Sequence, residues 1–144
     1  MNAGTMSADR NRVWHRANAL DESFVAAALV ITLYRDRLGE IENPHWRVIA
    51  EADDEMAIAC SCKQKFLATL NRSPELKPAT VAKLATIASD IADRVRNARL
   101  ILARHLQETE GSEQSAFSRI ATGADGLLQL AEHDMEALRM EVTA

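Results

Sequence analysis

An arginine and a histidine lie six residues apart in the stretch RVRNARLILARHLQ, residues 94–107. The imidazole of His105 could exchange a proton near neutral pH, and the guanidinium of Arg99 could bind a phosphate. Together these groups could cleave the backbone of an RNA. The structural alternative is that both are polar residues at the edge of a packed helix face. The way in which the helices pack decides between these interpretations.

The spacing of Arg99 and His105 on a late helix resembles the active-site signature of the HEPN ribonuclease family. The match covers seven residues of the 144, and Asn97 is the nearest polar neighbour. That family usually has a polar residue directly after the arginine, whereas this chain has Leu100. The resemblance implies metal-independent cleavage, in which the arginine and histidine of two protomers line a cleft. In an unbroken helix the two side chains point about 120° apart.

A metal site is the second chemical alternative. The chain has no His-x3-His pair and lacks the two helical Glu-x-x-His motifs of di-iron bundles, so that signature is absent and no cofactor is expected. In an antiparallel arrangement His45 would lie near His105, beside Glu42 and Glu108. These residues could form a weak zinc site and make the protein a metal-binding sensor. The structural alternative is that His105 caps the carboxyl end of its helix.

The composition predicts one soluble helical domain. The 144 residues include three prolines, five glycines and 4% aromatic residues, which favours helix over sheet. The net charge of −4 gives no general attraction to nucleic acid. The longest apolar run has 11 residues, whereas a membrane span needs about 20. Two cysteines and no export signal predict a cytoplasmic protein, and the excess of arginine over lysine is typical of bacterial chains.

Apolar residues recur every three or four positions in four segments, which predicts an antiparallel up-down-up-down bundle of four long helices. Residues 1–7 are expected to be a flexible N-terminus, and 8–142 a single domain. Gly111 and Ser112 mark the last break between helices. The expected helices are 8–40, 44–72, 78–108 and 112–142.

Local signals set the helix boundaries. Asn43 is a suitable N-cap with Pro44 as the first helical residue, and Pro78 is suited to begin the third helix. Two glycines in the last segment, Gly123 and Gly126, each cost a helix about 1 kcal/mol. We therefore expect a kink or a break at this point.

Two charged residues, Asp53 and Lys63, lie at the edges of the apolar face of the second segment. Antiparallel pairing places Asp53 opposite Ala98, which is next to Arg99 in the sequence. This predicts a structural ion pair between Asp53 and Arg99. The same estimate places Lys63 opposite Glu22, with Asp21 on the side nearer the core. Partly buried charges are normally paired. The face itself is expected to contain Ile49, Met56, Cys60 and Leu67.

Apolar residues remain on the first and third segments after each has supplied one stripe to the core. Such an excess usually marks an interface, so we expect a homodimer formed through these two helices. The expected interface residues are Val25, Leu29, Val30, Leu33, Leu100 and Ile101.

The sequence as a whole predicts a non-enzymatic bundle that self-associates and binds an unknown protein partner. An adaptor, a chaperone and a regulatory subunit all fit this description. A ribonuclease that uses Arg99 and His105 is the main alternative, and a metal sensor at His45 and His105 is the other.

Overall fold

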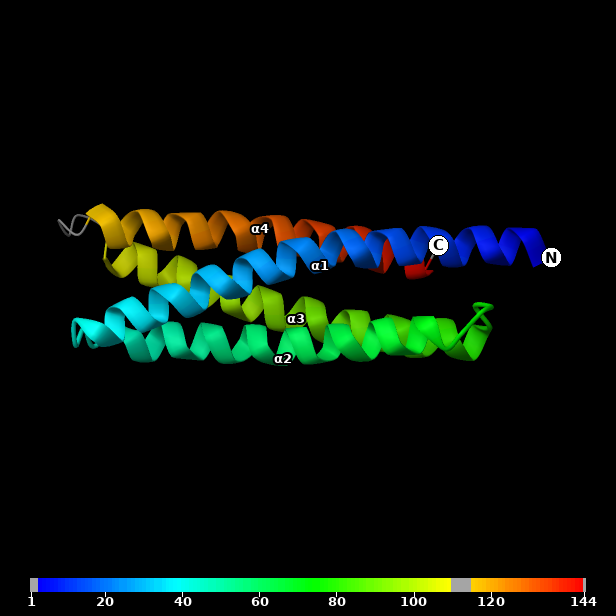
Figure 1. Cartoon of the computed structure of the whole chain (residues 1–144), viewed down its shortest axis with the longest axis horizontal. Coiled ribbons are helices and arrows are strands. Elements are labelled where there is room, and N and C mark those ends of the chain that lie inside the picture. The colour runs from blue at the N-terminus through cyan, green and yellow to red at the C-terminus, as the bar shows by residue number, and fades with distance from the viewer. Residues whose placement is uncertain (1–2, 110–114, 144) are drawn as a thin grey trace.

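The computed structural model describes residues 3–109 and 115–143, with side chains given for 10–109 and 119–143. These residues form four α-helices that run alternately up and down, and no strand (Figure 1). The all-α four-helix bundle predicted from the sequence is therefore confirmed. The helices are α1 (Ala3–Glu40), α2 (Trp46–Asn71), α3 (Pro78–Glu108) and α4 (Ser115–Thr143).

The four helices form a square in cross-section. Helix α1 packs against α2 and α4, and α3 packs against the same two helices. Within the described residues α1 and α3 make no contact, so they lie at diagonally opposite corners. The outer faces of α1 and α3 consequently point in opposite directions.

The core follows the apolar repeat of the sequence. The eight apolar residues that recur every three or four positions along α1, from Val13 to Leu38, are all buried, as are those of α3 from Leu84 to Leu102. The described part of the α4 series, from Ala121 to Val142, is also buried. Ten of the 28 buried apolar residues in the described part of the chain are alanines. The small side chains allow the helices to approach closely, while the larger ones fill the space between them.

The buried face of α2 differs from the expected one by one position. Ala59 and Phe66 are buried, whereas Cys60 and Leu67 pack only partly against the core. Their neighbour Lys63 is buried among the apolar residues instead of lying at the edge. The seven buried positions keep the 3-4 spacing, so a lysine occupies a core position that an apolar residue would normally fill. The buried side chains on this face are Ile49, Ala52, Met56, Ala59, Lys63, Phe66 and Leu70.

Two helix starts differ from the expected ones. Helix α1 already includes Ala3 to Ser7, which had been assigned to a flexible N-terminus. Helix α2 begins at Trp46 and not at Pro44, because residues 41–45 form a turn. The Asn43 side chain still serves this turn, since its Oδ1 accepts the N–H of His45 at 2.9 Å. The predicted start of α3 at Pro78 is confirmed.

The last helix has no break at its two glycines. Helix α4 runs without interruption from Ser115 to Thr143, so the predicted kink at Gly123 and Gly126 was wrong. Both glycines lie on the exposed side. The free energy that they cost the helix is smaller than the stabilisation from packing the buried Ala121, Ala124 and Leu128 on either side. The predicted stop at Gly111 and cap at Ser112 fall outside the described residues.

A stabilising substitution follows from this continuous helix. Replacing Gly123 or Gly126 with alanine is expected to raise the free energy of unfolding by about 1 kcal/mol each, because alanine is the better helix former. A β-carbon added at either position meets no atom within 4 Å. Urea denaturation of the two variants measures the change. A lowered midpoint in either variant would contradict an unstrained, continuous α4.

Candidate functional site

A cluster of three polar rings closes the end of the bundle where α1 ends and α2 begins. The hydroxyl of Tyr34 and Nε2 of His105 share a hydrogen bond of 2.6 Å, and both residues are buried. The ring of His45, in the turn before α2, lies 5.1 Å from that of His105, measured between centroids. The Nδ1 atom of His105 is buried and has no hydrogen-bond partner among the described residues. His105 is therefore a core residue and does not cap the end of α3.

Burial controls the protonation of this cluster. It lowers the pKa of His105 below its ordinary value of 6.5, and the positive charge of a protonated His45 would lower it further. Glu108 acts in the opposite direction with a smaller effect. Burial also raises the pKa of Tyr34. The neutral forms of both Tyr34 and His105 are therefore favoured at neutral pH.

The two residues of the ribonuclease-like pair contact different helices. Arg99 points towards α4, where its Nη1 binds a carboxylate oxygen of Glu132 at 2.6 Å. His105 points towards α1 and is only 1% exposed. A histidine that exchanges protons with RNA must reach its substrate. In this arrangement the His105 side chain does not reach the solvent. Arg99 and His105 therefore do not lie on one surface where they could act together.

The predicted ion pair between Asp53 and Arg99 was wrong in its partners. Asp53 forms an ion pair with Arg35 of α1, and the hydroxyl of Thr32 donates to its other oxygen at 2.6 Å. Asp53 therefore faces α1, not α3. Another carboxylate of α2, that of Glu55, faces α3 and binds Arg94 at 3.2 Å.

The buried lysine of α2 has one carboxylate partner. Lys63 forms an ion pair with Asp21 of α1, and its side chain is only 5% exposed, against 43% for Asp21. The ammonium group also lies 5.8 Å from the centre of the Phe24 ring. The antiparallel register predicts Lys63 opposite Glu22, with Asp21 nearer the core, and in the structure Lys63 binds Asp21.

The metal alternative has two of its residues in place. The structure brings His45 and His105 together, as the antiparallel register suggested. Within the described residues, however, no group of three or more His, Cys, Asp or Glu side chains is arranged to hold a metal ion. Zinc sites in proteins almost always use three or four protein ligands. The pair alone is therefore an incomplete zinc site.

A row of large apolar side chains lies on the outer face of α1. Val25, Leu29 and Leu33 are 47%, 66% and 48% exposed, and their spacing of four residues aligns them along the helix. Val30 lies beside the row but packs against the core. Leu130 of α4, which is 57% exposed, lies about one helical turn from Asp134, which faces Ser23 of α1. The hydrogen bond from Ser23 to Asp134 sets this register between α1 and α4.

The other expected interface residues lie at the opposite corner. Leu100 of α3 is 62% exposed, whereas Ile101 packs against the core. Both line an open groove of about 630 Å³ between α2 and α3, together with charged residues such as Glu51 and Arg104. Because α1 and α3 are diagonal, the two sets cannot form one continuous interface. The expected homodimer through both helices stays a prediction, and it would use two separate surfaces of each copy.

One described helix could cross a membrane by its length and composition. It is the part of α1 from Arg10 to Glu40, and 33% of its most apolar window is buried in the bundle. Helices in the core of soluble proteins pass the same criteria. The high hydropathy of this segment comes both from the exposed row of Val25, Leu29 and Leu33 and from the buried residues of α1.

Comparison with known proteins adds no relative. No family model, no curated protein and no solved structure matches this chain. The function must therefore be argued from the surfaces described above.

Proposed function

We propose that this protein acts through protein–protein association, and that two copies pair through the outer face of α1. The observation that carries the proposal is the exposed row of Val25, Leu29 and Leu33. A helix at the surface of a monomer needs only one apolar stripe, which α1 already directs into the core. The additional row places apolar surface in water, where burial against a second protein would be favourable.

A second copy of the chain is the occupant that this row fits. The row extends from Val25 to Leu33, or about 12 Å along the helix. Two such rows packed antiparallel around Leu29 would place Val25 of each copy against Leu33 of the other. Most soluble oligomers are symmetric, and a two-fold axis produces this reciprocal pairing. Stable interfaces bury about 800 Å² per partner, so the contact would have to extend beyond the row to neighbouring residues such as Leu130 of α4.

The test is the oligomeric state of the full chain and of two matched variants. Light scattering after size exclusion is expected to give a dimer for the wild type and a monomer for Leu29→Glu, because the charge would be buried at the centre of the interface. Leu100→Glu places the same charge at an equally exposed position on the opposite corner and is expected to remain dimeric. A monomeric wild type at high micromolar concentration, or a dimer disrupted by Leu100→Glu alone, would refute the proposal.

A further inference from the structure

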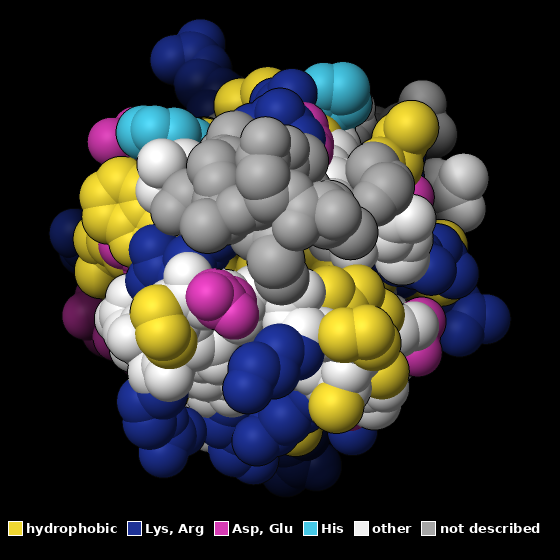
Figure 2. Space-filling view, turned by 90° about the vertical axis from the view of Figure 1, so that its right-hand side faces the viewer, with side chains coloured by type: hydrophobic (Ala, Val, Ile, Leu, Met, Phe, Trp, Pro, Cys, Tyr) yellow, Lys and Arg dark blue, Asp and Glu magenta, His cyan; other side chains and the backbone are white. Residues whose placement is uncertain are grey.

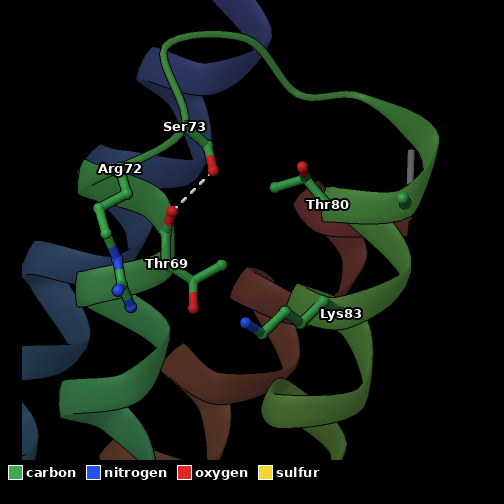
Figure 3. A pocket seen from close by; sticks show the side chains of 6 residues that line it. Thr69, Arg72, Ser73, Thr80 and Lys83 are labelled. Atoms are coloured by element: carbon green, nitrogen blue, oxygen red, sulfur yellow. Dashed lines mark hydrogen bonds between the residues drawn. The ribbon is translucent and has the colours of Figure 1, made fainter.

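A polar pocket lies at the other end of the bundle, where α2 ends and α3 begins. It has a volume of about 310 Å³ and is open to solvent. Helix α2 and the residues after it supply one wall, and the first turns of α3 supply the other (Figure 3). We call it the α2–α3 pocket. Its lining residues are Thr69, Arg72, Ser73, Ala79, Thr80 and Lys83.

The charge around this pocket is positive. Among the described residues, Arg72 and Lys83 have no carboxylate partner, and Lys77 lies in the adjoining turn. A further cation, Arg10 of α1, is held against the same turn because its guanidinium donates to the carbonyl oxygens of Ser73 and Leu70. Figure 2 looks onto this end and shows Lys and Arg side chains gathered over its lower half, where α2 and α3 meet. An anion would therefore be attracted to this end of the molecule.

The start of α3 offers donors to the same space. Pro78 occupies the first turn and has no N–H, and no side chain caps the helix start at Lys77. The first intrahelical hydrogen bond comes from Val81 to the carbonyl of Lys77. The N–H groups of Ala79 and Thr80 thus have no partner within the helix, and the first turn contains no acidic residue. Free N–H groups at a helix start are suited to bind an anion.

The hydroxyl of Thr69 adds a polar group to the pocket independently of the helix start. Thr69 is only 8% exposed, yet within the described residues its hydroxyl has no hydrogen-bond partner. Its backbone carbonyl, by contrast, accepts a hydrogen bond of 2.8 Å from Ser73. Figure 3 shows the Thr69 hydroxyl and the Lys83 ammonium group turned towards the same space between the two helices. The Thr69 hydroxyl is open to this pocket, where an oxygen of a bound anion could accept its hydrogen bond.

We propose that the α2–α3 pocket binds a phosphate group, either as free phosphate or as the phosphate of a small ester. The phosphate oxygens would accept hydrogen bonds from the N–H groups of Ala79 and Thr80, from the Thr69 hydroxyl and from the Lys83 ammonium group. Hydrogen bonds between charged groups are the strongest of these, so Lys83 contributes most to affinity. Arg72 lies along α2 on the side away from Thr80 and adds positive potential. The volume is at the lower end of the range for small-molecule sites, which leaves room for a compact organic group.

The test is a titration of the full chain with inorganic phosphate, followed by the amide resonances of Ala79 and Thr80 in heteronuclear NMR. Saturable shifts of these two amides are expected, while sodium chloride at equal ionic strength is expected to produce none. A parallel titration with a ribonucleoside 5′-monophosphate distinguishes the sources. Tighter binding of the nucleotide identifies an ester as the ligand, and tighter binding of inorganic phosphate identifies the free ion.

Matched variants separate a built site from general attraction to a basic end. Lys83→Gln is expected to weaken phosphate binding about tenfold, the equivalent of one charged hydrogen bond. Thr69→Val keeps the shape of the side chain and is expected to weaken it several-fold. Lys65→Gln removes an exposed lysine of α2 outside the pocket and is expected to leave binding unchanged. Shifts that do not saturate, or an equal loss in Lys65→Gln and Lys83→Gln, would overturn the proposal.

Discussion

Replacing Asp21 with alanine is expected to lower the free energy of unfolding by about 3 kcal/mol, because it leaves the charge of Lys63 buried without a partner. The Lys63 side chain is 5% exposed, and Asp21 is its carboxylate partner among the described residues. Removing one member of a buried pair is costly, whereas replacing the pair with apolar residues is often neutral. Lys63→Met alone is therefore expected to cost far less than Asp21→Ala.

A double-mutant cycle checks this prediction. The variant with both Asp21→Ala and Lys63→Met is expected to recover most of the stability that Asp21→Ala loses, as measured by urea denaturation. Glu22→Ala removes the adjacent exposed carboxylate and is expected to change stability by less than about 0.5 kcal/mol. If Asp21→Ala cost as much in the Lys63→Met background as in the wild type, the two residues would not be coupled.

Acidification below about pH 6.5 is expected to destabilise the bundle, and His105 is the expected cause. Burial lowers the pKa of His105 in the folded state, whereas the unfolded chain has the ordinary value of 6.5. Between these two pKa values the unfolded chain binds a proton that the folded chain does not. Stability is therefore complete above pH 6.5, and it decreases as the pH falls from there to the pKa of the folded state. The groups that face this imidazole are Tyr34, His45 and Glu108.

Two histidine variants test this assignment. His105→Phe keeps a ring in the core but cannot be protonated, so its stability is expected to depend less on pH than that of the wild type. His133→Gln removes an exposed histidine of α4 and is expected to keep the wild-type dependence. Thermal melts between pH 7.5 and 5 compare the three proteins. An unchanged pH dependence in His105→Phe would show that another group is responsible.

The fold was predictable because its main signals agree with one another. The apolar repeat predicted the buried residues of α1, α3 and the described part of α4, and the three prolines lie between helices or at the first residue of one. His105 could have been identified as a core residue, since it continues the 3-4 series three positions after Leu102. Because histidine is polar, the apolar repeat alone did not predict its burial. The same reasoning applies to Lys63, which continues the series of α2.

The partners of the charged residues could be predicted only in part. The antiparallel register estimates which residues lie at the same height, and it correctly suggested the proximity of Lys63 to Asp21. It does not give the direction of a side chain around the helix. Asp53 and Glu55 are at almost the same height on α2, yet the first faces α1 and the second faces α3. The α2–α3 pocket was not predicted, because it depends on the path of the chain between the two helices.

The alanine-rich core restricts where this protein could acquire a new binding partner. Methyl groups bring the helix backbones so close that a haem or another large planar molecule could not enter without separating them. Natural variation that alters recognition is therefore expected at the tips and outer faces of the helices, where substitutions change chemistry at little cost to folding. The sequence of the interior would change slowly, because a single added methylene there would disturb the packing of the neighbouring helices.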